Sequence, residues 1–194
     1  MADIRPARDV DREAVAAMLG RAFADDPAFS FIFPDPVERA RRLPPLFATF
    51  FERDATAGMR LIAEGCRGAT LWRAPGHAVE PGRIGLSGIW RAWRLLGGAL
   101  PRGKRVGDAI DAHFPAQPFW YLHVAGCDPA AQGQGLGRQL IQAGIDRTAG
   151  HPIYLETATE RNVGFYQTLG FRVTGQWSVP GDGPCFWSML RPQD

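Results

Sequence analysis

The stretch that most constrains the fold runs from residue 118 to residue 145, PFWYLHVAGCDPAAQGQGLGRQLIQAGI. It opens with an apolar, aromatic and β-branched run at residues 119–124, which is typical of a buried strand. Asp128-Pro129 is a turn signal that ends this strand. Three glycines at alternate positions within residues 133–137 then lead into an apolar stripe at helical spacing. The sequence therefore predicts a strand, a glycine turn and a helix in direct succession.

This succession is suited to binding an anion. Glycines let backbone N–H groups converge without Cβ atoms in the way, and a helix start adds unpaired N–H donors. A phosphate or pyrophosphate is therefore the expected ligand, and a glycine-rich connector without a ligand is the alternative. Two common phosphate-binding motifs fit poorly. A P-loop has Lys followed by Ser or Thr where this chain has Arg138-Gln139. The dinucleotide fingerprint G-x-G-x-x-G needs its third glycine one residue after Gly137.

The pattern that fits is Gln-x-x-Gly-x-Gly at Gln132, Gly135 and Gly137. It resembles the pyrophosphate-binding motif of the GNAT superfamily of acyl-CoA N-acyltransferases. The segments LETAT at residues 155–159 and NVGFYQTLGF at residues 162–171 resemble the second GNAT motif. The N-terminal AFADDP pattern and the later proline-rich break are similar to the puromycin N-acetyltransferase-like branch of this superfamily.

Periodicity and turn signals give the element order β-α-α-β-β-α-β-α-β-α-β-β, a mixed α/β (α+β) chain without repeats or linkers. The resemblance implies one GNAT-like domain over residues 1–194, with a twisted mixed sheet of about seven strands flanked by helices. It also implies that the fourth and fifth strands splay apart and that the pantetheine arm lies in the split.

Three segments carry more specific expectations. Residues 29–33 read as a loop of exposed aromatic side chains. Pro44-Pro45 interrupt a helix that begins near Val37, so this helix should kink or restart there. Further helices are expected from Ile84 to about Leu100 and, more weakly, over residues 106–113.

The resemblance also assigns the cofactor contacts. Backbone groups at Ala125, Gly126 and Cys127 are expected to pair with the pantetheine amides of acetyl-CoA. The pyrophosphate is expected on one continuous segment, mostly through backbone N–H groups: Gln132, Gly133, Gln134, Gly135, Leu136, Gly137 and Arg138. Side-chain changes at Gln134 or Leu136 should then be tolerated. Arg138 either adds positive charge to the phosphate or is a solvated residue.

Amine acylation by a thioester needs a proton acceptor for the amine, whose pKa is about 10, and a proton donor for the leaving thiolate. Tyr166 stands where the family has its general acid, and a phenol keeps its proton at neutral pH. The alternative is a core tyrosine. Asn162 matches a family residue near the pantetheine, although it is also placed to cap the short helix.

Two residues are candidates for the general base. In the central strand, His123 shares a face with Tyr121, opposite Leu122 and Val124. Glu156 lies between apolar neighbours in the next strand, where a carboxylate suits binding an ammonium group or relaying its proton. A structural histidine and an arginine salt bridge are the respective alternatives. Candidates for the amine pocket lie in the variable segments: Asp25, Asp26, Phe29, Phe33, Trp90, Trp93 and the turn at residues 181–183.

Composition excludes several classes of protein. A net charge of +2 without a basic run argues against a nucleic-acid partner. No apolar stretch approaches the ~20 residues that span a bilayer, and the N-terminus lacks an apolar signal region, so a cytoplasmic protein without a membrane partner is expected. The three cysteines are far apart, so neither a metal site nor a disulfide framework is expected.

The leading hypothesis is an N-acetyltransferase that moves an acetyl group from acetyl-CoA to a primary amine of a small molecule, by direct attack in a ternary complex. Within enzymes, the alternative is a protein N-terminal or lysine acetyltransferase. From a different class, the alternative is a non-catalytic acyl-CoA-binding module. Both a monomer and a homodimer are compatible with the sequence.

Overall fold

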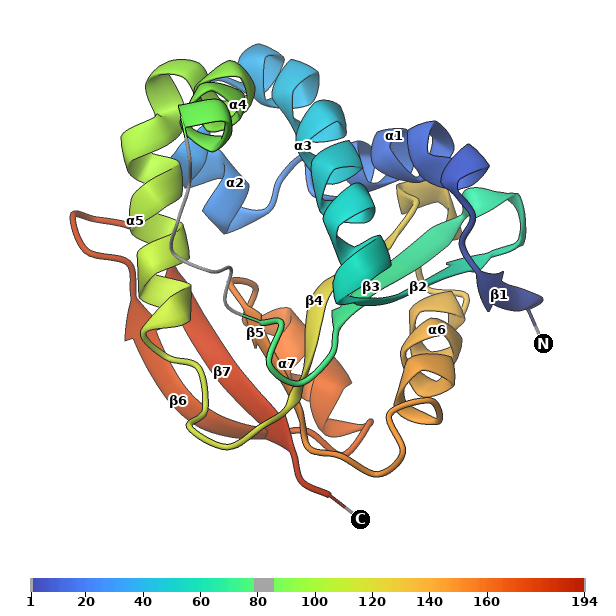
Figure 1. Ribbon diagram of the computed structural model, residues 1–194. Coiled ribbons are helices and arrows are strands. Elements are labelled where there is room, and N and C mark those ends of the chain that lie inside the picture. Colours follow the sequence, from blue (N-terminus) through green and yellow to red (C-terminus); the bar gives the residue numbers. More distant parts are fainter. Residues whose placement is uncertain (1, 79–85, 194) are drawn as a thin grey trace.

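The computed structural model describes residues 2–78 and 86–193, and its centre is a sheet of seven strands in the order β1-β2-β3-β4-β5-β7-β6 (Figure 1). Neighbouring strands are antiparallel except β4 and β5, which are parallel. The strand bounds are β1 Ile4–Pro6, β2 Gly58–Ala63, β3 Gly68–Arg73, β4 Trp120–Cys127, β5 Ile153–Thr157, β6 Arg172–Ser178 and β7 Cys185–Arg191. The predicted mixed seven-stranded sheet is confirmed.

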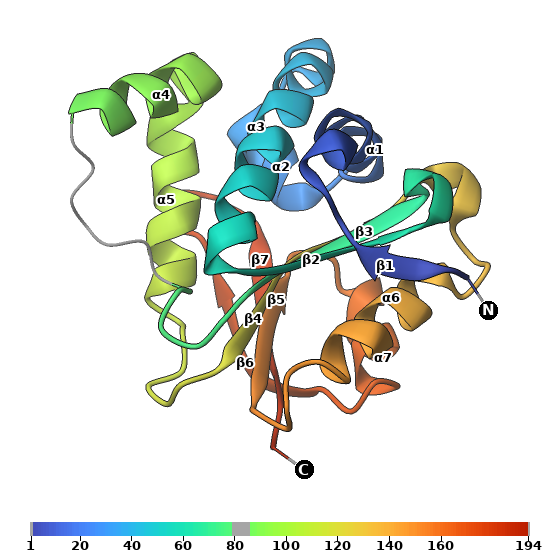
Figure 2. The ribbon, with the colours of Figure 1, turned by 45° about the vertical axis from the view of Figure 1, so that its right-hand side comes forward.

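Helices occupy both faces of the sheet. Their bounds are α1 Arg12–Ala22, α2 Pro27–Ile32, α3 Pro36–Ala57, α4 Leu86–Leu96, α5 Leu100–Asp111, α6 Leu136–Ile145 and α7 Arg161–Gln167. Figure 2 shows α1, α2 and α3 on one face of the sheet and α6 and α7 on the other. One core cluster joins α1 and α3 to the first face, and a second joins α6 and α7 to the opposite face.

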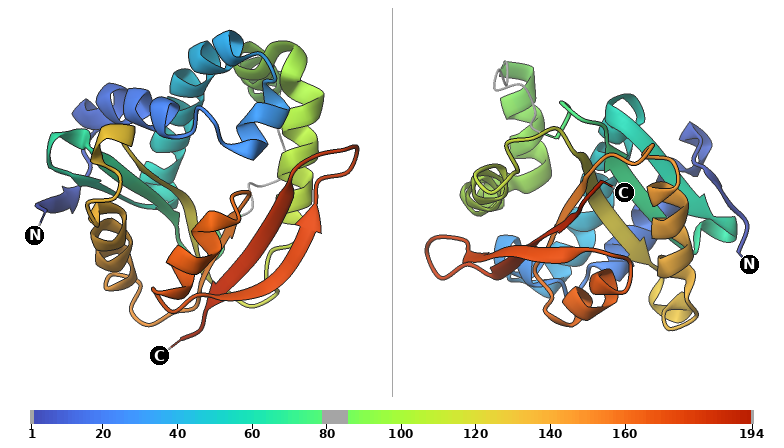
Figure 3. Two further views of the ribbon diagram at one scale, coloured as in Figure 1. Left: turned by 180° about the vertical axis from the view of Figure 1, so that it is seen from behind. Right: turned by 90° about the horizontal axis from the view of Figure 1, so that it is seen from below.

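The feature that positions the site is the separation of β4 from β5. The two strands pair only at Trp120↔Ile153 and Tyr121↔Tyr154, close to where both begin. Farther along, β4 stays paired with β3 as far as Cys127, whereas β5 pairs with β7. The sheet therefore divides into two halves, seen from behind in Figure 3. This splay between the fourth and fifth strands is the one that the family resemblance implied.

Two expectations for the N-terminal half are wrong. Residues 29–33 do not form an exposed loop, because Asp26 caps a short helix, α2, by accepting hydrogen bonds from the N–H groups of Ala28 and Phe29. Phe33 follows this helix and is fully buried. The sequence predicts an exposed loop over residues 29–33 because a helix of six residues is too short to show a helical repeat of apolar residues.

Helix α3 continues without a break through Pro44-Pro45, which corrects the expected kink or restart. Tertiary packing offsets the lost backbone hydrogen bonds. Helix α1 packs along α3, and a Cβ atom added at Gly20 would come within 3.0 Å of the Pro44 ring. The absence of a side chain at Gly20 therefore lets α1 approach the proline segment closely.

The predicted helix from Ile84 begins outside the described residues, and α4 is described from Leu86 onward. A 3-10 turn at residues 97–99 separates α4 from α5. Helix α5 starts at Leu100, earlier than predicted, because Pro101 is tolerated in the first turn of a helix. Among the described helices, none combines the length and the apolar character that crossing a membrane requires.

Candidate active site

The glycine turn forms the expected anion-binding geometry. Gly133 and Gly135 both have φ of +75°, and Gly135 is the N-cap of α6. A Cβ atom at either position would meet no atom within 4 Å, so the surface of the turn is open. The N–H groups at the start of α6 lack partners within the helix and point outward from it. Residues 132–138, called the phosphate turn below, therefore suit a pyrophosphate.

Side chains hold the phosphate turn in shape. The amide of Gln132 donates to the carbonyl of Cys127 at 3.3 Å, and the amide of Gln134 donates to the carbonyl of Ala130 at 3.2 Å. Arg67 in turn donates to the Gln134 side chain at 2.7 Å. The expected tolerance at Gln134 and Leu136 is therefore not supported. In particular, Leu136 is buried in a core cluster under the turn.

Arg138 is exposed and contacts α7 rather than standing free. Its NH2 donates to the hydroxyl of Thr168 at 2.7 Å. The guanidinium thus lies between the first turn of α6 and the end of α7. This contact fixes a positive charge beside the phosphate turn.

The predicted pantetheine contacts lie on the unpaired edge of β4. Ala125, Gly126 and Cys127 pair with β3 on one side, and β5 has already diverged on the other. Gly126 also has a packing role, because a Cβ atom there would come within 2.7 Å of Leu19 on α1. The free edge of β4 leads from the phosphate turn toward the point where β4 and β5 separate.

Helix α7 supplies Tyr166 from the face opposite α3. Tyr166 is only 8% exposed, and its ring contacts Phe171 and Phe165. Burial, reinforced by the charges of Glu156 and Asp26, raises the pKa of the phenol, so it keeps its proton. Asn162 lies inside the first turn of α7 and does not cap it, because the N-cap is Glu160.

Glu156 on β5 is a buried carboxylate with one unpartnered oxygen. Its Oε1 accepts a hydrogen bond from the hydroxyl of Tyr121 on β4. Its Oε2 is buried without a hydrogen-bond partner. Burial raises the pKa of Glu156 to about 8, and the hydrogen bond from Tyr121 and the charge of Arg73 oppose this shift only in part. Strand alternation puts Glu156 on the same face of β5 as Tyr154, since Ile153 and Leu155 lie in the opposite core cluster.

His123 occupies a β-bulge in β4. Leu71 pairs with Val124 and Trp72 pairs with Leu122, so His123 is the extra residue between two consecutive pairs. The bulge breaks the alternation that the sequence predicted. Val124 joins the α1–α3 core cluster, and only Leu122 lies in the opposite cluster. The imidazole of His123 contacts Phe50 on α3, with ring centroids 4.8 Å apart.

Asp54 and Arg73 complete this side of the site, and sequence reasoning missed both. Asp54 on α3 is fully buried, with Oδ2 2.6 Å from Nδ1 of His123 and Oδ1 2.8 Å from Nε of Arg73. One signal was available: Asp54 follows Phe47 and Phe51 at helical spacing, so it lies on the buried stripe of α3. A carboxylate on such a stripe needs charged partners, which only the fold reveals.

The candidates for the amine pocket are dispersed. Asp26 caps α2, and its charge contributes to the raised pKa of Tyr166. Phe29 and Phe33 belong to the core. Trp90 and Trp93 on α4 are 60% and 61% exposed, so they point to solvent. In the turn at residues 181–183, Asp182 has a positive φ of 58°. Asp26 therefore lies close enough to Tyr166 for its charge to contribute to the raised pKa of the phenol.

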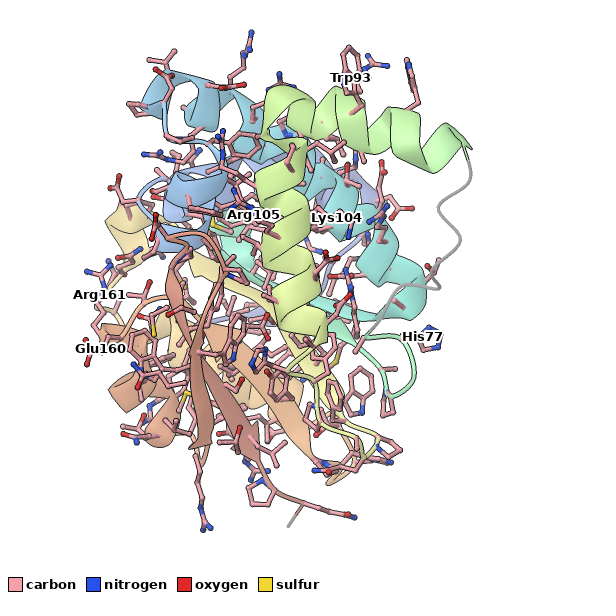
Figure 4. The ribbon with its side chains drawn as sticks, turned by 90° about the vertical axis from the view of Figure 1, so that its left-hand side faces the viewer. His77, Trp93, Lys104, Arg105, Glu160 and Arg161 are labelled. Carbon is pink, nitrogen blue, oxygen red and sulfur yellow. The ribbon has the colours of Figure 1, made fainter. Side chains whose placement is uncertain are left out.

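Helix α5 contacts both the β6–β7 turn and α2. On this helix, NH1 of Arg105 lies 3.4 Å from the carbonyl of Pro180 in the β6–β7 turn. Arg105 is labelled in Figure 4. Just beyond the helix, His113 stacks on Trp177 of β6 with ring centroids 4.1 Å apart. Arg102 donates to the carbonyl of Ile32 at 2.9 Å and so ties α5 to α2. Three elements thus interlock at this end of the molecule.

Comparisons with known proteins agree with this geometry. The family model for the acetyltransferase (GNAT) domain matches residues 90–173. The peptidyl-lysine N-acetyltransferase YjaB of Salmonella typhimurium is 35% identical over 125 residues, which are 60% of this chain and 82% of YjaB. The chain therefore belongs to the GNAT acetyltransferase family. The seven-stranded sheet with diverging β4 and β5 agrees with this assignment.

Two further comparisons place the chain within this family. The N-alpha-acetyltransferase RimI of Mycobacterium tuberculosis is 38% identical over 82 residues, or 40% of this chain. The chain matches only 52% of RimI, about half of that relative's length. A crystal structure of histone acetyltransferase HPA2 and related acetyltransferase from Corynebacterium glutamicum has a TM-score of 0.79 and 28% identity, covering 100% of this chain and 98% of its own.

Proposed function

We propose that the chain transfers the acetyl group of acetyl-CoA to a primary amine of a small molecule, by direct attack within a ternary complex. The observation that carries this proposal is the buried, unpartnered Oε2 of Glu156. Buried polar atoms normally have a partner, and a missing one at a cleft points to function. The ammonium group of an acceptor supplies both the missing hydrogen bond and the opposite charge.

The phosphate turn and the free edge of β4 account for the cofactor. The pyrophosphate lies on the N–H groups of residues 132–138, and the fixed charge of Arg138 supports it. The pantetheine amides pair with backbone groups of Ala125, Gly126 and Cys127, and Asn162 on α7 adds a further contact to the cofactor. This arrangement directs the thioester toward the gap between β4 and β5.

The proton balance of the reaction gives each of the three candidate catalytic residues a role. An ammonium carries three N–H bonds and the amide product carries one, so two protons leave the nitrogen. Glu156 accepts the first proton, which frees the lone pair that forms the C–N bond. The C–S bond breaks with its electron pair moving to sulfur, and Tyr166 protonates the thiolate. His123 accepts the second proton, and one proton in net is released to solvent.

The interlocked acceptor end supports a small acceptor, because a peptide substrate requires an open groove. Helix α5 contacts both the β6–β7 turn and α2 at this end. YjaB is a peptidyl-lysine N-acetyltransferase and RimI is an N-alpha-acetyltransferase, so protein acetylation is the second candidate. The puromycin N-acetyltransferase-like branch, the cytoplasmic location and a monomeric or homodimeric state stay predictions.

The test is thiol release from acetyl-CoA with three groups of acceptors: small primary amines, lysine peptides and peptides with a free N-terminus. Tyr166→Phe should lower turnover by about 10²-fold with acetyl-CoA affinity unchanged. Tyr154→Phe is the matched control, because its hydroxyl bonds only to Ser188, and turnover should stay within about threefold.

Each other outcome contradicts a stated part of the proposal. Unchanged turnover in Tyr166→Phe removes Tyr166 as the acid. Turnover with peptides alone replaces the small acceptor by a protein. Saturable acetyl-CoA binding without turnover of any amine would support the alternative of a non-catalytic acyl-CoA-binding module.

A further inference from the structure

Asp54, Arg73 and His123 form a buried charge network, called the acceptor network below, that joins three elements. Asp54 comes from α3, Arg73 from the end of β3 and His123 from the bulge in β4. Both carboxylate oxygens of Asp54 are engaged, at 2.8 Å to Arg73 and 2.6 Å to His123. Although burial opposes ionisation, His123 and Arg73 together lower the pKa of Asp54 below its usual value. Asp54 is therefore an ionised carboxylate inside the protein.

The network fixes which nitrogen of His123 carries the proton. An ionised carboxylate only accepts hydrogen bonds, so Nδ1, 2.6 Å from Oδ2 of Asp54, must carry a hydrogen. On the opposite side of the ring, NH2 of Arg73 lies 3.5 Å from Nε2. A guanidinium only donates, so it faces a lone pair rather than an N–H group. The neutral imidazole thus has its hydrogen on Nδ1 and its lone pair on Nε2.

We propose that Asp54 is a positioning residue of the acceptor site, which holds His123 in the tautomer that accepts the second proton of the amine. This inference rests on the proposed function. In the step, the N–H bond of the attacking nitrogen breaks, its electron pair stays on nitrogen, and the proton bonds to Nε2 of His123 in place of the 3.5 Å contact with NH2 of Arg73. The charge of Asp54 then stabilises the imidazolium, while Asp54 itself contacts no substrate atom.

The groups that face His123 support a division of roles. Arg73 is a cation beside the ring and opposes its protonation, whereas Asp54 favours it. Tyr121 lies next to His123 with ring centroids 5.4 Å apart, and its hydroxyl is already donated to Glu156. Phe50 is apolar and only packs on the ring. Among these groups, Asp54 is the carboxylate in contact with the ring.

The first test is Asp54→Asn. The side-chain amide of asparagine can donate to Nδ1, which favours the opposite tautomer and turns the lone pair toward α3. Turnover should fall by about 10²-fold, while acetyl-CoA affinity stays unchanged. Asp108→Asn is the matched control, because Asp108 is an exposed carboxylate that pairs with Lys104 on the same helix, and turnover should not change.

A double-mutant cycle separates positioning from a merely structural effect. If Asp54 acts through His123, then Asp54→Asn in a His123→Ala background should change turnover by less than about threefold. An independent, multiplicative loss of turnover in that background would overturn the proposal. So would an unchanged turnover of Asp54→Asn in the otherwise native chain.

A third measurement needs no variant of Asp54 and keeps the proposal testable if Asp54→Asn does not fold. The ¹⁵N shifts of the native protein's histidines are recorded at alkaline pH, and His123→Ala assigns the signal. A hydrogen on Nδ1 of His123 is expected, and a hydrogen on Nε2 overturns the inference. This result does not depend on turnover, so it remains informative if no amine is acetylated and the proposed function itself fails.

Discussion

The cofactor side and the acceptor side of the site are built in different ways. The phosphate turn comes from one continuous stretch, residues 132–138, and offers mainly backbone N–H groups to its ligand. The acceptor side is assembled from side chains on α3, β3, β4 and β5 that are far apart in the sequence. Recognition by the backbone can be encoded locally, whereas proton transfer here depends on tertiary contacts.

Their electrostatics differ as well. The phosphate turn is exposed, and its attraction for an anion comes from helix N–H groups and the fixed guanidinium of Arg138. On the acceptor side, Glu156 and Asp54 are buried carboxylates whose pKa values move in opposite directions. Asp54 contacts Arg73 and His123 through its two carboxylate oxygens. Glu156 accepts a hydrogen bond from Tyr121 on one oxygen, and among the described residues its other oxygen has no hydrogen-bond partner. The protein therefore keeps one carboxylate ionised and the other ready to exchange a proton.

The largest expected effect is on the acceptor side. Glu156→Gln should lower turnover by about 10²-fold or more and leave acetyl-CoA affinity unchanged, because the amide cannot accept the proton. In the native protein, kcat/KM for the amine should rise with pH through about 8, since Glu156 must be ionised to act as a base. The variant should lose this rise. The measurement is a pH–rate profile of both proteins with the same amine.

Asp108→Asn serves as the control for carboxylate loss, because Asp108 is exposed and pairs with Lys104. Its pH–rate profile should match that of the native protein. An unchanged profile in Glu156→Gln would show that another group titrates, and the acceptor side would lose its proposed base.

A smaller effect is expected on the cofactor side. Gly135→Val places a β-branched residue at φ of +75°, which costs about 1–2 kcal/mol and distorts the N-terminus of α6. Acetyl-CoA affinity should fall about tenfold, and turnover at saturating acetyl-CoA should be retained. Gly107→Ala in α5 is the control, because its Cβ meets no atom within 4 Å and its backbone is helical. If Gly135→Val and Gly107→Ala bound acetyl-CoA with equal affinity, the phosphate turn would not be the binding element.

The smallest expected effect is on stability. The pKa of Glu156 is about 8 in the folded protein, against an ordinary value near 4.5, so the folded state holds the proton more tightly. Its contribution to stability is complete below about pH 4.5 and is lost as the pH rises through 8. The difference in Tm between Glu156→Gln and the native protein should therefore increase between pH 5 and pH 9. A constant difference would mean that the carboxyl group titrates normally.

The same contrast explains what could be predicted from the sequence. The phosphate turn, β4, α6 and the splay of β4 from β5 followed from local patterns and from the family resemblance. Tyr166 and Glu156 could be proposed from the sequence because a motif marks the first and apolar neighbours in a strand mark the second. The bulge at His123 was not found, because one extra residue in a ladder is visible only when both strands are paired.

Asp54 and Arg73 show the same limit. Each is a single charged residue whose role appears only when α3 and β3 meet β4. The unbroken helix through Pro44-Pro45 was missed for a related reason. Local backbone chemistry predicts a kink there, and packing against Gly20 of α1 overrides it. Long-range packing thus decides the features that local sequence leaves open.

The most direct test of the division between the two sides is calorimetric titration with acetyl-CoA of three proteins: the native chain, Glu156→Gln and Gly135→Val. We expect the same dissociation constant for the native protein and Glu156→Gln, and a constant about tenfold higher for Gly135→Val. Equal weakening by both variants would contradict the division into a backbone-built cofactor side and a side-chain-built acceptor side. The absence of saturable binding by the native protein would contradict the proposed function as well.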